Sequence, residues 1–311
     1  MNTPAACLQP IGPARHTVRG RLQEPGPHNI SAAMSRRKQH NPSRTRAHDS
    51  GGERPAQGPR ARHGGKPQKG SGHGGSDAYL YGFHAVLAAL ENPERDPERL
   101  IMTRNAEAEL TRQGLRPNIH PEIMDGEALS AMLPPGAVHQ GIALKTSPLP
   151  DLDVFDACQG AARVVVLDQV TDPHNFGAIL RSAAVFGAEA LVTTERNSPA
   201  LGGALAKAAS GGLERVKIAR IANLVRALEE LKELGFEVIG LDGEGEMSLP
   251  EMKLSPKVAL VLGAEGAGLR RLTREHCDLL ARLPAAGPMK SLNVSNAAAV
   301  ALYELFRRQG S

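Results

Sequence analysis

Residues 163–194 read RVVVLDQVTDPHNFGAILRSAAVFGAEALVTT, and this stretch decides the fold of the C-terminal half of the chain. Val164–Leu167 and Ala190–Thr193 are short apolar runs of the kind found in strands that are buried on both faces. Between them, Phe176–Phe186 carries apolar side chains at helical spacing. A strand, a helix and a second buried strand in this order predict two parallel strands joined by a crossover helix.

The same alternation continues to the end of the chain. Strands are predicted at 216–219, 237–240, 257–262 and 279–283, and helices at 200–209, 223–234 and 293–308. We therefore expect residues 161–311 to form one α/β domain, with a parallel sheet covered by helices on both faces.

A shorter alternation precedes this domain. Residues 77–146 predict helices at 84–90, 107–113 and 126–132, and strands at 99–102 and 141–145. This pattern is typical of a small α/β domain. Residues 147–160, which contain two prolines and three aspartates, are expected to be a linker.

The charge of the chain is unevenly distributed. Residues 1–76 hold 13 Lys and Arg against 3 Asp and Glu, a net charge of +10, while residues 77–311 hold 24 against 30. With 12 glycines and 9 prolines, residues 1–76 lack the apolar surface that would offset the entropy of ordering. We expect a disordered basic tail that attracts nucleic acid, although a tail that only improves solubility is an alternative.

Composition also limits the class of protein. The three cysteines, Cys7, Cys158 and Cys277, are widely spaced and stand in no metal-binding pattern, so free thiols and no metal site are expected. No run of about 18 apolar residues is present to span a membrane, and no secretory signal is recognisable at the N-terminus. These features predict a cytoplasmic protein.

Ligands of open α/β sheets bind beyond the carboxyl ends of the strands, and three predicted strand ends are rich in polar residues or glycine. The first leads into Asn175 and Arg181, which could be no more than a helix cap and a surface charge. The second is Gly263–Gly268, with the sequence GAEGAG, whose glycine spacing is not that of the dinucleotide-binding fingerprint. The third leads into residues 287–296, where more small polar side chains gather than a helix cap requires.

Taken together, these three segments resemble a known family. NxGxxxR at 175–181, GxEGxG at 263–268 and SLNVS at 291–295 are similar to motifs one, two and three of the SpoU (TrmH-like) group of SPOUT methyltransferases. Tyr81-Gly82 and residues 138–141 resemble the ribosomal-protein-like substrate-binding domain of its RlmB-like branch. That branch methylates a guanosine ribose in the peptidyl-transferase loop of 23S rRNA.

The resemblance implies a fold, a cofactor and a partner. Residues 161–311 would form a trefoil-knotted SPOUT domain, a feature that no pattern alone would predict. S-adenosyl-L-methionine would bind bent inside the knot, contacted by Gly263, Leu283, Ser291 and Leu292. The enzyme would be an obligate homodimer with the closing helix at the interface.

The resemblance also implies a catalytic set, which consists of Asn175, Arg181, Glu265, Ser291 and Asn293. The methyl group would pass directly to a ribose 2′-oxygen. The family arginine is sometimes described as the general base, but a guanidinium is not deprotonated in proteins. We therefore expect Arg181 to clamp the substrate phosphate and the 2′-oxygen, with the proton acceptor left open. Asn175 would position Arg181 or the substrate, and Glu265 would orient the arginine or neighbouring backbone. Ser291 and Asn293 would hold the loop and the cofactor.

Other functions fit the same residues less well. A tRNA ribose methyltransferase of the same family is one alternative, although the separate domain at 77–146 favours rRNA. A non-catalytic RNA-binding or ribosome-assembly factor is another, but it would not need Asn175, Arg181, Glu265 and Asn293 together. A nucleotide-binding oxidoreductase is disfavoured by the glycine spacing.

Overall fold

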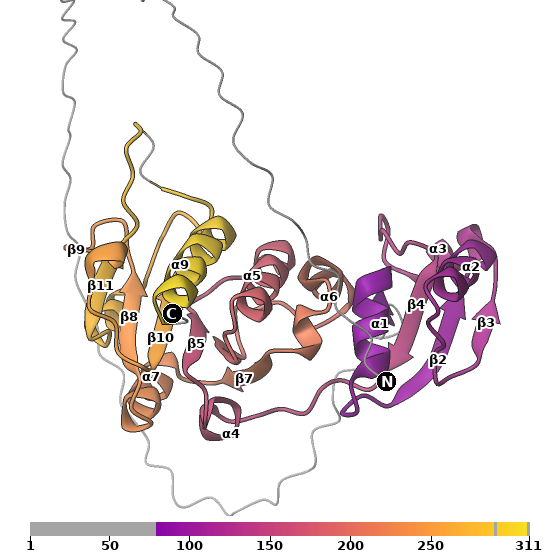
Figure 1. Ribbon diagram of the computed structural model, residues 1–311, viewed down its shortest axis with the longest axis horizontal. Coiled ribbons are helices and arrows are strands. Elements are labelled where there is room, and N and C mark those ends of the chain that lie inside the picture. The colour runs from indigo at the N-terminus through magenta and orange to yellow at the C-terminus, as the bar shows by residue number, and fades with distance from the viewer. Residues whose placement is uncertain (1–78, 289–290, 310–311) are drawn as a thin grey trace, which may run out of the picture. The chain divides into compact units, whose positions relative to one another are not determined.

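Two β-sheets organise the part of the chain that the computed structural model describes, residues 79–288 and 291–309 (Figure 1). The first belongs to an N-terminal lobe, residues 79–146, and the second to a C-terminal lobe, residues 153–309. The tail expected at 1–76 and Cys7 lie outside the described residues.

The N-terminal lobe is a four-stranded sheet in the order β1-β4-β2-β3, with three helices. The strands are β1 (Tyr79–Tyr81), β2 (Pro97–Met102), β3 (Pro121–Ile123) and β4 (Ile142–Thr146), and the helices are α1 (Phe83–Glu91), α2 (Arg104–Arg112) and α3 (Gly126–Met132). The expected helix over 126–132 is confirmed, and its start is capped by Asp125, which accepts a hydrogen bond from the Ala128 amide at 2.7 Å. Strands β1 and β3 were not predicted, because three residues are too few to show a period.

The C-terminal lobe contains a seven-stranded sheet in the order β7-β6-β5-β10-β8-β11-β9, and every pair in it is parallel. This confirms the predicted parallel sheet. Its strands are β5 (Arg163–Leu167), β6 (Ala190–Thr194), β7 (Lys217–Ile221), β8 (Glu237–Leu241), β9 (Met247–Ser248), β10 (Val258–Leu262) and β11 (Leu279–Arg282). Its helices are α4 (Val154–Cys158), α5 (Pro173–Val185), α6 (Gly203–Ala209), α7 (Leu224–Glu233), α8 (Arg271–Glu275) and α9 (Val294–Gln309), with 3-10 turns at Gly212–Glu214 (η1) and Leu249–Glu251 (η2).

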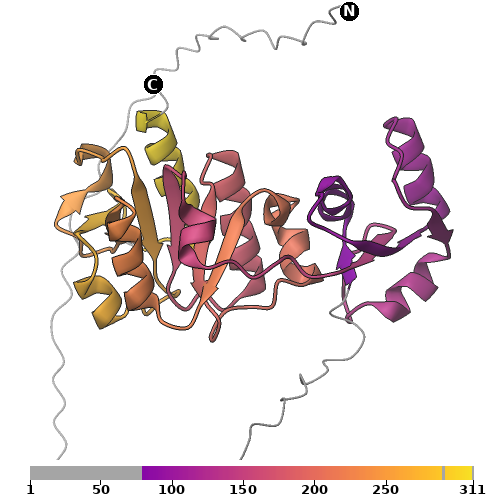
Figure 2. The ribbon, with the colours of Figure 1, turned by 90° about the horizontal axis from the view of Figure 1, so that it is seen from below.

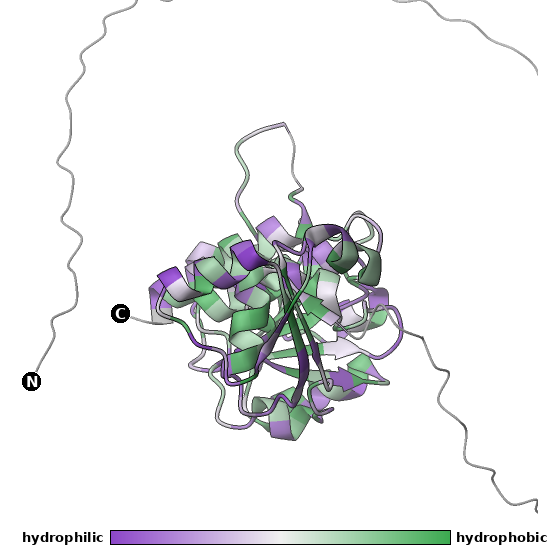
Figure 3. Ribbon diagram, turned by 90° about the vertical axis from the view of Figure 1, so that its right-hand side faces the viewer, coloured by the Kyte–Doolittle hydropathy of each residue, from purple (hydrophilic) through white to green (hydrophobic). Residues whose placement is uncertain are grey.

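Alternate residues of each central strand enter different cores. In β5, Val165 and Leu167 pack in the core that holds α5, α6 and α9, while Val164 and Val166 pack in the core that holds α4 and α7. Figure 2 shows these helices against the sheet, and in Figure 3 the hydrophobic residues gather on the strands and the inner helix faces. Full burial of one such side chain contributes roughly 1.5–3 kcal/mol, which explains why these strands are apolar throughout.

One expectation about the connection between the lobes was wrong. Residues 147–160 are not a linker throughout, because α4 occupies Val154–Cys158 and its Asp153 side chain caps the helix at the Asp156 amide, 2.8 Å away. Val154, Ala157 and Cys158 are buried with the second core. Pro148 and Pro150 do lie in irregular chain, whereas Asp153 caps the helix that follows.

Two of the three expected free thiols lie in the described residues, and both are free. Burial raises the pKa of Cys158 and that of Cys277 to about 12. Both groups therefore stay protonated at neutral pH and are poor nucleophiles.

A buried ion pair joins the two lobes. The guanidinium of Arg95 donates to both carboxylate oxygens of Glu214, at 2.7 and 3.0 Å, and each side chain is only 3% exposed. Arg95 also donates to the Ser147 carbonyl at 2.8 Å, and the side-chain Nδ2 of Asn92 donates to Glu214 at 2.7 Å. With this much hydrogen bonding, the pair fixes the orientation of η1 against the N-terminal lobe.

Glu214→Ala should destabilise the protein strongly, because it leaves the Arg95 guanidinium buried without its partner. We expect a loss of about 3–5 kcal/mol in the free energy of unfolding, measured by urea denaturation. Arg226→Ala is the matched control, since it removes a pair with Glu230 in which the arginine is 80% exposed. The control should change stability by less than about 1 kcal/mol. Equal effects of the two variants would contradict a structural role for the buried pair.

Candidate active site

The first strand end positions Asn175 in the first turn of α5. Asp172 caps this helix by accepting from the amides of His174 and Asn175, at 3.1 and 3.3 Å. Pro173 opens the helix, where its missing N–H costs nothing. Since Asp172 performs the capping, the side-chain amide of Asn175 is available for other partners.

Three side chains from the three polar segments are joined in one hydrogen-bonded chain. Asn175 donates through Nδ2 to Glu265 Oε2 at 3.2 Å, and it accepts at Oδ1 from Asn293 Nδ2 at 3.1 Å. Asn293 in turn accepts at Oδ1 from the Ser295 amide and hydroxyl, at 2.9 and 2.6 Å. Residues that are 118 positions apart in the sequence are thus in direct contact.

The direction of this chain is fixed by its two ends. Glu265, when ionised, can only accept a hydrogen bond, and the backbone amide of Ser295 can only donate one. Asn175 must therefore turn its NH₂ to Glu265, and Asn293 must turn its NH₂ to Asn175. Ser295 was not among the predicted site residues, although it lies in the SLNVS segment and follows Asn293 by two positions.

Glu265 lies at the tip of a tight loop that follows β10. Ala264 and Gly268 exchange backbone hydrogen bonds at 3.1 and 2.9 Å, which closes the loop on itself. Gly266 and Gly268 have φ of +79° and +67°, a region that favours glycine. A Cβ on Gly263 would lie 2.1 Å from the Gly268 carbonyl carbon, so the loop can close only on a glycine there.

A buried carboxylate ties the same loop to β5. Asp168 is 0% exposed, and it accepts from the Arg270 amide at 3.1 Å and from Arg270 Nε at 2.6 Å. The Asp168 amide donates to the Leu262 carbonyl at 2.8 Å. Sequence reasoning did not select Asp168 or Arg270, although an aspartate directly after an apolar strand is a usable signal.

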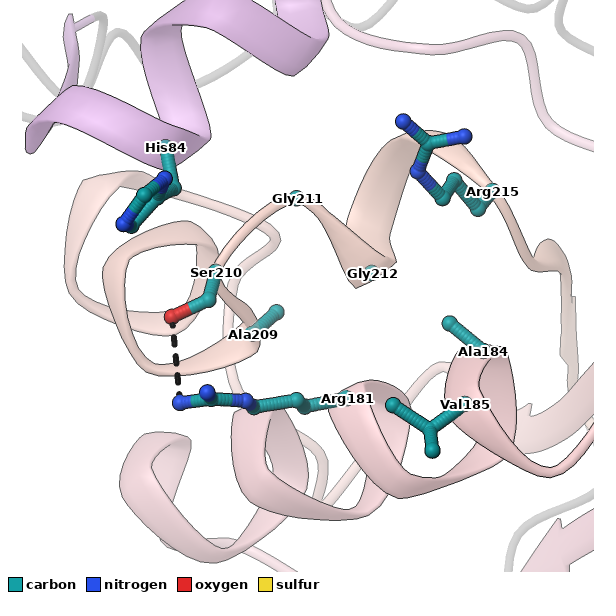
Figure 4. A pocket seen from close by; sticks show the side chains of 9 residues that line it. All are labelled: His84, Arg181, Ala184, Val185, Ala209, Ser210, Gly211, Gly212 and Arg215. Carbon is teal, nitrogen blue, oxygen red and sulfur yellow. Dashed lines mark hydrogen bonds between the residues drawn. The ribbon is translucent and has the colours of Figure 1, made fainter. Parts of the chain in front are cut away.

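Arg181 lies apart from this chain of hydrogen bonds, on the exposed side of α5. Its Nη1 atom donates to the Ser210 hydroxyl at 3.4 Å, and its side chain lines a cavity of about 290 Å³ (Figure 4). Asn175 was expected to position Arg181 or the substrate, and Glu265 to orient the arginine or neighbouring backbone. The hydrogen bonds join Asn175 to Glu265, and Ser210 is the partner of Arg181.

The remaining predicted residues lie near the ends of β11 and α9. Leu283 follows β11 and is half-buried, while Leu292 is 55% exposed and Ser291 is exposed. Residues 289–290, within the third polar segment, lie outside the described residues. Strands β10 and β11 both pair with β8 in parallel, so Gly263 and Leu283 emerge at the same edge of the sheet.

No group of three or more His, Cys, Asp or Glu side chains in the described residues is arranged to hold a metal ion. Among the described helices, none is long and apolar enough to cross a membrane.

Comparisons with known proteins identify the family. The SpoU rRNA methylase family model matches residues 162–303, and the model for RNA 2′-O ribose methyltransferase substrate binding matches residues 79–152. The chain is 39% identical over 246 residues to the 23S rRNA (guanosine-2′-O-)-methyltransferase RlmB of Escherichia coli K12, covering 74% of this chain and 98% of that protein. The chain belongs to the SpoU rRNA methylase family.

Two further relatives are similar in sequence, and one solved structure is similar in fold. RlmB of Photorhabdus laumondii is 41% identical over 246 residues, which is 75% of this chain and 98% of that protein. An uncharacterised tRNA/rRNA methyltransferase of Synechocystis is 39% identical over 244 residues, and the chain spans 62% of its length. The SpoU methyltransferase AviRb of Streptomyces viridochromogenes, solved with AdoMet, is 23% identical with a TM-score of 0.63 over 75% of this chain and 90% of that one, which shows the shared fold.

The strand ends of this SpoU domain have the chemistry to hold a nucleoside cofactor. Gly263 and Leu283 bring main-chain groups to the sheet edge, and the side chains of Leu283 and Leu292 present apolar surface. An adenine ring needs a flat apolar contact and a few main-chain hydrogen bonds, so these residues fit such a ligand.

Gly263→Ala should disrupt the loop that carries Glu265, because the new methyl group cannot be placed without moving the Gly268 backbone. We expect a loss of about 1–3 kcal/mol in the free energy of unfolding, together with weaker cofactor binding by calorimetry. Gly243→Ala, in the segment after β8, is the control, since a Cβ there meets nothing within 4 Å. If Gly263→Ala unfolded with the same free energy and bound the cofactor as tightly as Gly243→Ala, the tight closure of the loop would not contribute to stability or to cofactor binding.

Proposed function

We propose that this protein transfers a methyl group from S-adenosyl-L-methionine to the 2′-oxygen of a guanosine ribose in 23S rRNA. The observation that carries the proposal is the hydrogen-bonded chain from Asn293 through Asn175 to Glu265, which joins all three family motifs at one edge of the sheet. The RlmB relatives, which the chain matches over nearly their whole length, supply the substrate class.

The domain division follows the two lobes. We assign RNA binding to residues 77–146 and methyl transfer to residues 161–311, with residues 1–76 as a basic tail that attracts RNA. The family match over residues 79–152 supports the first assignment. An rRNA substrate implies action in the cytoplasm.

A trefoil knot is proposed for the end of the C-terminal lobe. Strand β8 lies between β10 and β11, both of which follow it in sequence. After β11 the chain returns to α9, whose Arg308 donates to the carbonyls of Leu249 and Met252, in the segment that follows β9. The late segment thus lies against the earlier 249–252 segment, as threading through a loop requires.

In the reaction, Arg181 would act on the substrate oxygen. When bound, S-adenosyl-L-methionine supplies an electrophilic methyl group on a sulfonium centre. A ribose hydroxyl is a very weak acid, so the developing negative charge on its oxygen must be stabilised. Arg181 offers a permanent positive charge with several donors and would stabilise the negative charge on the oxygen without acting as a base. The hydroxyl proton would pass to water as the methyl–oxygen bond forms and the methyl–sulfur bond breaks, leaving a neutral thioether. The hydrogen bonds among Asn175, Glu265 and Asn293 would hold the ends of the three segments together. Ser291, two residues before Asn293, would contact the cofactor.

The proposed function and Arg181 are tested together in a strain that lacks the gene. Mapping of ribose methylation should show the loss of one 2′-O-methyl group in 23S rRNA with tRNA unchanged. Wild-type protein and Arg226→Ala should restore that group, whereas Arg181→Ala should not. Purified Arg181→Ala should still bind the cofactor, because the side chain lies outside the hydrogen-bonded chain. Loss of a tRNA site instead would favour the tRNA alternative, and no loss at all would favour a non-catalytic factor.

A homodimer is proposed through α9. Val300, Tyr303 and Phe306 lie on this helix and are 48%, 50% and 45% exposed. Phe186 packs edge-on against Tyr303, with ring centroids 5.7 Å apart. A cluster of large apolar side chains left in water is typical of an interaction surface.

Phe306→Glu should dissociate the proposed dimer, because a carboxylate in an apolar interface is costly to desolvate. Sedimentation velocity should then give the mass of one chain, while the wild type gives that of two. Phe155→Glu is the control, since Phe155 is 55% exposed on α4, which packs in the other core. A wild-type protein that sediments as a single chain would end the proposal.

A further inference from the structure

The cavity beside Arg181 is lined by both lobes (Figure 4). His84 comes from α1 of the N-terminal lobe, while Arg181, Ser210 and Arg215 come from the C-terminal lobe. The cavity measures about 290 Å³, and the rest of its lining consists of Ala, Val and Gly. The lining thus contains two guanidinium groups, an imidazole and a hydroxyl, and no carboxylate.

The backbone between α6 and η1 is shaped to present these groups. Ser210 has φ of +48°, which is uncommon for a residue with a side chain, and Gly211 follows with φ of +91°. A Cβ on Gly212 would lie 2.8 Å from the Leu180 carbonyl oxygen, so this segment packs directly on α5. The left-handed Ser210 brings its hydroxyl to Arg181, and such strain is typical of functional sites.

The buried ion pair keeps the two sides of the cavity together. Glu214 immediately precedes Arg215, and it is bound to Arg95 in the lobe that carries His84. A Cβ on Gly211 would lie 3.0 Å from the Ala88 side chain of α1. The position of His84 relative to Arg181 is therefore set by packing and by a buried charge pair.

Arg215 can bind a ligand. Among the described residues it has one ion pair, with Glu91, which spans 3.8 Å, and both side chains are 66% exposed. A pair this open contributes little to stability. The Arg215 guanidinium is therefore a positive charge that the fold does not need for its stability.

We propose that His84 and Arg215, together with Arg181 and Ser210, bind a backbone phosphate of the RNA next to the ribose that is methylated. The inference rests on the proposed function and extends it to residues outside the family motifs. Guanidinium groups bind phosphate oxygens through paired hydrogen bonds, and the lining holds two guanidinium groups against the single carboxylate of Glu91, which stands 3.8 Å from Arg215 outside the lining, so the cavity favours an anion. The lining has no Phe, Tyr or Trp on which a base could stack, which favours the backbone over a base.

The position along α5 suits this role. Arg181 follows Asn175 by six residues, which is about 9 Å along a helix axis. A phosphate held at Arg181 would therefore be adjacent to, and not inside, the site where Asn175, Glu265 and Asn293 meet. The cavity would set where the RNA strand lies relative to the cofactor.

The test is the salt dependence of RNA binding. The probe is a transcript of the 23S rRNA segment that contains the peptidyl-transferase loop, and the variants are His84→Ala and Arg215→Ala. Arg215→Ala should weaken binding about tenfold and lower the slope of log affinity against log salt by about 0.7–1, the loss of one phosphate contact. His84→Ala should weaken binding about threefold to tenfold, while both variants should bind the cofactor with wild-type affinity.

Two control variants separate this role from a general effect of charge or folding. Arg226→Ala removes an arginine that is 80% exposed on α7 and should leave affinity and slope unchanged. Arg215→Lys keeps the charge and should keep most of the slope, but it loses the paired hydrogen bonds and part of the affinity. An Arg215→Ala protein with wild-type affinity and slope would overturn the proposal.

If a variant folds poorly, a second measurement tests the phosphate contact on the wild-type protein. A short RNA that carries a neutral methylphosphonate beside the target ribose should bind the wild type about tenfold more weakly. The same change should have little further effect on Arg215→Ala, since the two changes remove one interaction. Wild-type binding that is insensitive to methylphosphonates on both sides of the target ribose would overturn the proposal. Failure of the wild type to methylate the transcript would instead count against the proposed function, because these measurements record binding alone.

Discussion

The parallel pairing of β5 with β10 is the constraint on which the rest of the C-terminal lobe depends. The two strands run side by side from Arg163 and Val258 to Leu167 and Leu262, and both are buried on both faces. Because parallel strands end at the same edge, the loop after β5 and the loop after β10 must meet there. The buried carboxylate of Asp168 fixes the contact between these two loops, because it accepts two hydrogen bonds from Arg270. The contact between Asn175 and Glu265 follows from that arrangement.

The fold of this lobe was predictable because its central strands β5 and β10 consist almost wholly of Val, Leu and Ala. Such short runs, separated by helices with a clear period, are typical of strands buried on both faces of a parallel sheet. The short elements were not predictable. Strands β1 and β3 have three residues each, and α4 begins after a segment whose prolines and aspartates indicate a loop. The order of the strands in the sheet depends on packing between distant segments, so no local sequence pattern predicts it.

The polar strand ends pointed only to the segments of the candidate site, and the family resemblance named the residues within them. The structure brings Asn175, Glu265 and Asn293 into contact, while Arg181 lies apart from them. The partner of Arg181 could not be found in the same way, because Ser210 lies 29 residues along the chain in a left-handed turn. His84 and Arg215 were also missed. They belong to different lobes, and only the docking of those lobes places them in one cavity.

The ion pair between Arg95 and Glu214 also has a consequence for biosynthesis. Its members are separated by 119 residues, and the ribosome adds about 5–20 residues per second. Arg95 therefore leaves the ribosome roughly 6–24 seconds before the carboxylate that neutralises it. During that interval the N-terminal lobe can form its own sheet, but the surface around Arg95 must remain hydrated. The docking of the lobes therefore cannot precede the synthesis of Glu214, and the cavity that depends on this docking forms only after that point.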